Sequence, residues 1–120
     1  NLQTLFCSDN HMTKLVVNNC DNLSDLDASY NDLTALNLNG TGKLAFIELE
    51  WNDLTYLDLS NQPFLQRLDV SNNQLITLDL TNDTVLSFIN LSDNYSLNDL
   101  RTDGCYSIRQ IVGTWHDYNF

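Results

Sequence analysis

The chain has 120 residues, the length of one domain, and carries 5 Lys and Arg against 16 Asp and Glu, for a formal net charge of −11. This balance argues against nucleic acid as a partner, because phosphate binding requires clustered basic side chains. The apolar runs are short, with Leu15-Val16-Val17 a typical example, so no membrane insertion is expected in this segment.

Apolar residues recur along the chain every 21 residues. The first apolar column holds one leucine per unit: Leu2, Leu23, Leu44, Leu65 and Leu86. One residue is inserted after Asn94, and the units are therefore 2–22, 23–43, 44–64, 65–85 and 86–107, with a partial unit over 108–120. A repeat of this length predicts a solenoid, in which each coil packs only on its neighbours, and the whole chain, 1–120, forms one domain.

The segment from Leu65 to Leu75, LQRLDVSNNQL, fits the pattern LxxLxLxxNxL and resembles the consensus of leucine-rich repeat proteins. Its continuation, Leu75 to Leu80, nearly echoes the first half, and this short nested form is similar to the repeats of bacterial surface and secreted proteins. The resemblance implies a right-handed solenoid with a parallel β-sheet on its concave side, extended segments or short strands on its convex side, and little or no helix. It also implies an extracellular or cell-surface location, no catalytic residues and no cofactor.

Each LxxLxL segment is predicted to form a short parallel strand, with positions four and six facing inward and positions three and five facing outward. The expected strands are 4–6, 25–27, 46–48, 67–69 and 88–90. A unit of 21 residues leaves no room for an ordinary helix beside a strand and two turns. Because the repeat begins at Leu2 without a capping segment, we expect the chain to be a piece of a longer protein.

One asparagine follows each strand, at the point where the chain must turn. Its amide can bond backbone groups of the bend and of the next coil, which no strand ladder reaches. These residues are therefore interpreted as structural: Asn10, Asn31, Asn52, Asn73 and Asn94.

The outward positions carry the candidate ligand-binding residues. Three carboxylates are predicted to form a column with neighbours ~5 Å apart, where like charges repel. Arg67 falls between two phenylalanines on which its guanidinium can stack, and two further aromatic residues fall at the sheet's edge. The candidates are Asp27, Tyr30, Phe46, Glu48, Trp51, Arg67, Asp69 and Phe88.

Three interpretations of this surface are open. The first is a non-catalytic protein-binding module of a secreted or cell-surface protein, which favours a basic partner. The second is a carbohydrate-binding module, in which Tyr30 and Trp51 stack on sugar rings while the carboxylate column bonds hydroxyls. The third is a structural spacer between domains.

Enzymatic and metal-binding functions have little support. No HxxxH, CxxC or GxSxG spacing occurs, and the two histidines stand in the first and sixth units, too far apart to share a metal ion. Asp27 and Glu48 have a glycosidase-like spacing, but they fall on an open sheet. Cys7 belongs to an inward column, while Cys20 and Cys105 lie four coils apart, at roughly 19 Å, so no intrachain disulfide is expected.

Overall fold

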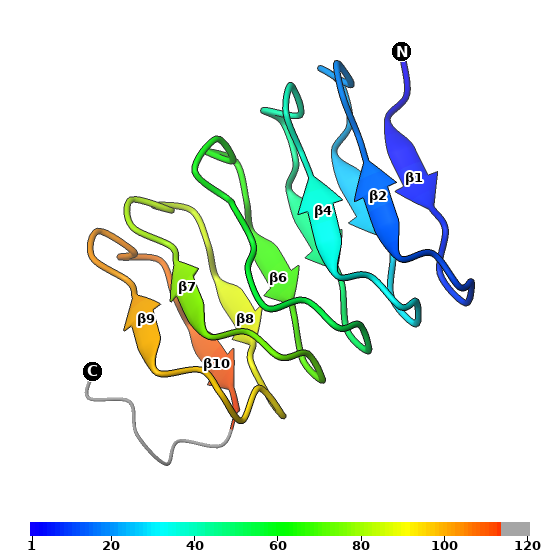
Figure 1. Ribbon diagram of the computed structural model, residues 1–120. Helices are drawn as coiled ribbons and strands as arrows, with labels where there is room; N and C mark the ends of the chain where they lie inside the picture. Colours follow the sequence, from blue (N-terminus) through cyan, green and yellow to red (C-terminus); the bar gives the residue numbers. More distant parts are fainter. Residues whose placement is uncertain (114–120) are drawn as a thin grey trace.

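The computed structural model describes residues 1–113, in which ten short strands wind into a solenoid without a helix (Figure 1). Residues 114–120, including His116, lie outside the described residues. One six-stranded parallel sheet takes one strand from each coil: β1 (Thr4–Phe6), β3 (Asp25–Asp27), β5 (Phe46–Glu48), β6 (Arg67–Asp69), β8 (Phe88–Asn90) and β10 (Gln110–Val112). The predicted parallel solenoid is confirmed, its five predicted strands occupy their predicted residues, and β10 adds a sixth.

The other side of the solenoid is discontinuous. There β2 (Lys14–Val16) pairs with β4 (Ala35–Asn37), and β7 (Thr77–Asp79) pairs with β9 (Asp99–Arg101). Coil three, formed by the unit 44–64, contributes no strand here, so two separate two-stranded sheets face the continuous one (Figure 1).

The core fills the space between these two sides. Leu23, Leu44, Leu65 and Leu86 are completely buried, as the 21-residue column requires. Burial of a leucine side chain stabilises the fold by roughly 1.5–3 kcal/mol, so the stacked columns supply most of the driving force. Leu2 is exposed by comparison, because only one coil covers it.

The asparagine column connects neighbouring coils through the backbone. The Asn73 Nδ2 donates hydrogen bonds to the carbonyl oxygens of Leu49 (2.9 Å), Val70 (3.2 Å) and Ser71 (3.2 Å), and its Oδ1 accepts one from the Leu54 amide (3.0 Å). Three other asparagines also bond both their own bend and the preceding coil: Asn31, Asn52 and Asn94. Asn10 has no preceding coil and bonds only its own bend, at Cys7 and Ser8.

Candidate functional site

The outward surface of the six-stranded sheet, called here the six-stranded face, brings six of the eight candidates together. The strand register sets Asp27 beside Glu48 and Glu48 beside Asp69. The same register sets Arg67 between Phe46 and Phe88. The predicted carboxylate column and its aromatic neighbours therefore share one surface.

Arg67 leans toward the C-terminal part of this face. Its guanidinium carbon lies 3.9 Å from the centre of the Phe88 ring, and its Nε lies 3.7 Å from Glu48 Oε1. A cation held over an aromatic ring and beside a carboxylate is stabilised by both. Arg67 thus offsets the charge of Glu48 and leaves Phe46 free to meet other groups.

A hollow lies on the N-terminal part of the six-stranded face. It is lined by Phe6, Asp25, Leu26, Asp27, Phe46 and Glu48. The phenylalanines are 69% and 42% exposed, so neither serves the core. No Lys or Arg lines this hollow in the part of the chain that the structure describes. The hollow therefore combines two exposed rings with three carboxylates, of which only Glu48 has a cation, Arg67, beside it.

Phe6 and Asp25 belong to this hollow but are absent from the sequence-based candidates. Both occupy outward positions, Phe6 in the column of Asp27 and Asp25 in the column of Phe46. The 21-residue spacing would have been enough to predict both, because it indicates which residues of neighbouring strands lie side by side.

Two members of the carboxylate column also hold the backbone bend that follows their strand. Asp27 Oδ1 accepts hydrogen bonds from the amide (3.0 Å) and the hydroxyl (2.6 Å) of Ser29. Asp69 Oδ1 accepts the same pair from Ser71, at 3.0 and 2.7 Å. These aspartates therefore have a local structural role as well as an outward position.

Coil three breaks this pattern, because Glu50 stands where its neighbours have serine. Burial raises the pKa of Glu50, and the negative charges of Asp69, Glu48 and Asp27 raise it further. Its Oε2 is buried without a hydrogen-bond partner among the described residues. Glu50 therefore lies within the negative potential of the carboxylate column, and it is absent from the sequence-based candidates.

Tyr30 and Trp51 lie apart from the other six candidates, at the edge where the strands end. Their rings are stacked, with centroids 6.1 Å apart and planes 14° from parallel. Trp51 lines a separate hollow with Asn31, Asp32, Asn52, Asp53, Asn72, Asn73, Gln74, Asp93 and Tyr95. The structure therefore divides the candidate residues between a sheet surface and an edge.

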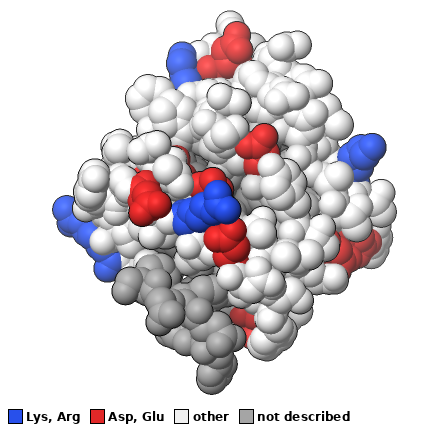
Figure 2. Space-filling model, turned by 60° about the vertical axis from the view of Figure 1, so that its left-hand side comes forward, with Lys and Arg blue, Asp and Glu red and all other residues white. Residues whose placement is uncertain are grey.

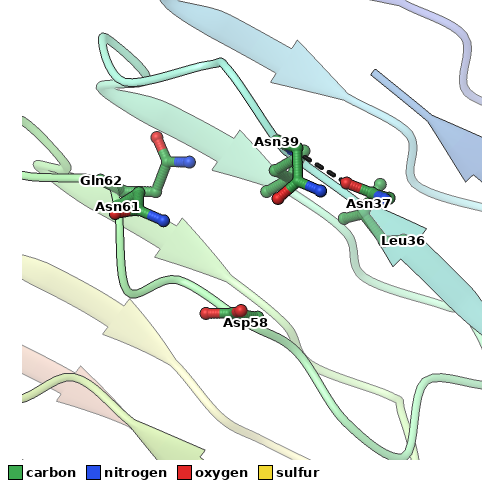
Figure 3. Close-up of a pocket in the computed structure, with 7 residues that line it drawn as sticks. Leu36, Asn37, Asn39, Asp58, Asn61 and Gln62 are labelled. Carbon is green, nitrogen blue, oxygen red and sulfur yellow. Dashed lines mark hydrogen bonds between the residues drawn. The ribbon is translucent and has the colours of Figure 1, made fainter. Parts of the chain in front are cut away.

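Another hollow opens on the side of the two-stranded sheets, beside coil three (Figure 3). It is lined by Leu36, Asn37, Leu38, Asn39, Asp58, Asn61 and Gln62. The side chain of Asn37 is already used there, since its Oδ1 accepts a hydrogen bond from the Asn39 amide (2.9 Å). This hollow lies where coil three has no strand to pair with β4, so it is a consequence of the interrupted sheet.

A further polar column, which the sequence-based candidates do not include, runs through the closing turn of each unit. Its members are Cys20, Thr41, Gln62, Asp83 and Cys105. Gln62 Nε2 donates to Thr41 Oγ1 (3.0 Å), while Gln62 Oε1 is buried and has no partner among the described residues. Burial, with the nearby charge of Asp79, raises the pKa of Asp83 to about 6. The cysteines are free thiols, and burial raises the pKa of Cys105.

The charged residues of the chain are mostly acidic, and Figure 2 shows one face on which basic side chains lie among acidic ones. Within residues 1–113, no group of three or more His, Cys, Asp or Glu side chains could hold a metal ion. The same residues include no helix long and apolar enough to cross a membrane.

Comparisons with known proteins agree with this architecture. The leucine-rich repeat family model matches residues 64–83. Among solved structures, the chain is similar to the functional domain of InlJ from Listeria monocytogenes, described as including a cysteine ladder, with 29% identity and a TM-score of 0.72. The match covers 91% of this chain but 26% of the InlJ chain, so the present sequence spans about a quarter of that length. No curated protein sequence matches. Together with the 21-residue solenoid, these likenesses show that the chain has the leucine-rich repeat fold.

Proposed function

We propose that the chain is a non-catalytic protein-binding module whose six-stranded face binds a basic segment of a partner. The leucine-rich repeat fold supports protein interaction in general. The hollow lined by Phe6, Asp25, Asp27 and Phe46 supplies the chemistry for a Lys or Arg side chain, namely aromatic faces beside carboxylates.

The observation that carries this proposal is the placement of Arg67. This side chain lies over Phe88 and beside Glu48, on the same sheet and two strands away from Asp25. The hollow at Phe6 and Phe46 offers the same kinds of group, since Asp25 and Asp27 lie there beside the rings without a cation. A partner's arginine would therefore reproduce there a contact that the chain already makes within itself.

The expected affinity is moderate and sensitive to salt. An exposed cation over a ring contributes ~0.5–1 kcal/mol, and an exposed ion pair ~0–1 kcal/mol, so one basic side chain is not sufficient. Several basic residues in an extended segment can use the hollow together with Glu48 and Asp69. Salt screens such contacts, so binding should weaken as ionic strength rises.

A synthetic peptide of alternating Gly and Arg provides the test, because its citrulline analogue has nearly the same shape without the charge. The wild-type chain should bind the arginine peptide and not the analogue. The double variant Phe6→Ser/Asp25→Asn should weaken binding at least ~10-fold, or about 1.4 kcal/mol.

The matched control is Phe64→Ser/Asp21→Asn, which changes an exposed ring and an exposed carboxylate outside the six-stranded face. It should leave the affinity unchanged. Equal binding of the two peptides, or wild-type affinity in the Phe6/Asp25 variant, would contradict the proposal and favour the spacer interpretation.

We further propose that the module belongs to a secreted or cell-surface protein. Support comes from the form of its repeats, which resembles that of bacterial surface and secreted proteins. Protease treatment of intact source cells should remove the segment from cell-bound protein, or the segment should be found in the medium. Complete protection inside intact cells would contradict this location.

A further inference from the structure

The edge beside the six-stranded sheet carries one residue per coil in an unusual backbone conformation. These residues have φ angles from 53° to 57°, in the left-handed region, and they are Asp9, Tyr30, Trp51, Asn72 and Asp93. Asn and Asp are the non-glycine residues that tolerate this conformation best, whereas bulky residues are rare there. Two of the five positions therefore hold residues that the local backbone disfavours.

Burial does not explain the two aromatic residues. Tyr30 is 49% exposed and Trp51 is 53% exposed, so neither contributes to the core. Their mutual stacking is worth ~0.5–1.5 kcal/mol, comparable with the ~1–2 kcal/mol cost of a left-handed residue. Stability thus gives no net reason for an aromatic pair at this place.

The indole of Trp51 stays half-exposed although Tyr30 stacks on one side of it. The hollow that Trp51 lines takes residues from coil two, such as Asp32, to coil five, such as Tyr95, but not Tyr30. Asn72, Gln74 and Tyr95 contribute polar groups to this hollow. The result is a flat apolar surface beside a group of hydrogen-bonding side chains.

The carboxylates of this hollow already accept hydrogen bonds. Asp53 Oδ1 accepts one from Gln74 Nε2 (2.9 Å), and Asp93 Oδ1 accepts one from the Tyr95 hydroxyl (2.5 Å). The side-chain amide of Asn72 makes no hydrogen bond within the described residues. These groups suit a ligand with many hydroxyls better than a cation, because both carboxylates already accept hydrogen bonds and the unbonded group is an amide.

We propose that this edge hollow is a binding site for a neutral saccharide, separate from the six-stranded face. The apolar C–H face of a sugar ring would pack on the exposed part of the Trp51 indole. Its hydroxyls would bond the amides of Asn72 and Gln74 and the carboxylates of Asp53 and Asp93. Tyr30 would act as a positioning residue that holds the indole plane by stacking behind it.

A glycan array of neutral and acidic saccharides, probed with the wild-type chain, is the first measurement. At least one neutral saccharide should be retained, and calorimetric titration with that saccharide then gives its Kd. Trp51→Asn, which introduces the residue type found at the same position of the next coil, should weaken this Kd at least ~10-fold. Tyr30→Asn should weaken it less, and Tyr106→Asn, an exposed tyrosine outside the hollow, should not change it.

Two further readouts separate a binding role from a structural one. The thermal midpoint of Trp51→Asn should equal or exceed that of the wild type, and its affinity for the arginine peptide should be unchanged. The proposal is overturned if the array retains no neutral saccharide or if Trp51→Asn binds the saccharide with wild-type affinity. Loss of arginine-peptide binding in Trp51→Asn would assign this edge to the protein partner and would also overturn it.

Discussion

Coils three and four, residues 44–64 and 65–85, have the same length and the same interior but different exteriors. Each presents three completely buried side chains from the strand side, and each has a buried asparagine after its strand. Coil four falls almost entirely within the segment that matches the family model, and it has a strand, β7, on the opposite side. Coil three has no strand there, and it carries Glu50 and Trp51 in place of Ser71 and Asn72.

The comparison indicates which residues serve the fold. Because the interiors agree, the departures of coil three are not needed for the solenoid. A carboxylate oxygen, Glu50 Oε2, that is buried without a hydrogen-bond partner among the described residues and a tryptophan in a left-handed conformation both reduce stability locally. We therefore propose that contact with another molecule accounts for these departures.

The largest expected effect tests the shared interior. Asn52→Ala and Asn73→Ala should each lower the free energy of unfolding by at least ~2 kcal/mol, because several buried backbone groups lose a partner at roughly 1–3 kcal/mol each. Chemical denaturation of both variants measures this effect. Similar losses in the two coils are expected, and a loss in only one would show that their interiors differ after all.

The next effect concerns the polar column, where coil four has Asp83 and coil three has Gln62. The pKa of Asp83 is about 6 in the folded chain, above the ~3.9 of an unfolded aspartate, so ionisation opposes folding. The protonated carboxyl of Asp83 is therefore the form that favours folding. Its contribution to stability is fully present below about pH 4 and is lost as the pH rises through about 6. Asp83→Asn should be more stable than the wild type by about 1–2 kcal/mol at pH 7.5.

Denaturation at pH 4 and at pH 7.5 checks this sign. The advantage of Asp83→Asn should shrink or vanish at the lower pH, where the wild-type carboxyl is protonated in the folded chain. An advantage that is the same at both pH values would mean that the ionisation of Asp83 is not its cause.

A smaller effect is expected when coil three receives the serine of coil four. Glu50→Ser removes a buried oxygen without a partner and should raise stability at pH 7 by ~0.5–1 kcal/mol. Because the pKa of Glu50 is raised, its ionised form destabilises the fold, so this gain should decrease as the pH falls toward the folded pKa. Thermal unfolding at neutral and acid pH measures it, and a less stable Glu50→Ser chain would show that Glu50 has a stabilising contact.

The smallest effect on stability is expected from Trp51→Asn, within about 0.5 kcal/mol of the wild type. The lost stacking on Tyr30 is offset by a residue that tolerates the left-handed conformation. A decrease of more than about 1 kcal/mol in the free energy of unfolding, measured by denaturation, would mean that the aromatic pair supports the fold. The main reason for proposing a ligand site at this edge would then no longer hold.

The sequence predicted the fold well because the repeat itself encodes the register. Once Leu2 and Leu23 are recognised as equivalent, every strand of the six-stranded sheet and every neighbour on its surface follows. The candidate site was predicted less completely. The sequence predicted Tyr30 and Trp51 at the edge of the sheet, but it did not predict that Trp51 lines a hollow separate from the six-stranded face.

The missed features depend on side-chain environment and not on periodicity. Glu50 differs from its neighbours because its Oε2 is buried near other acids. Gln62 does so because its Oε1 is buried without a hydrogen-bond partner among the described residues. The absent strand of coil three has no clear sequence signal, since Tyr56-Leu57-Asp58 fits the same pattern as Thr77-Leu78-Asp79. The three-residue strands on this side depend on hydrogen bonds to a neighbouring coil, which a pattern within one unit does not describe.

The most direct test of the proposed function is to map the arginine peptide on the ¹⁵N-labelled chain by NMR titration. Shifts of the backbone amides should concentrate at residues 4–6, 25–27 and 46–48 and should saturate together, while β7 and β9 on the opposite side stay unchanged. This result would place the basic segment on the N-terminal part of the six-stranded face. Saturable shifts confined to β7 and β9, or no saturable shifts at all, would contradict the account.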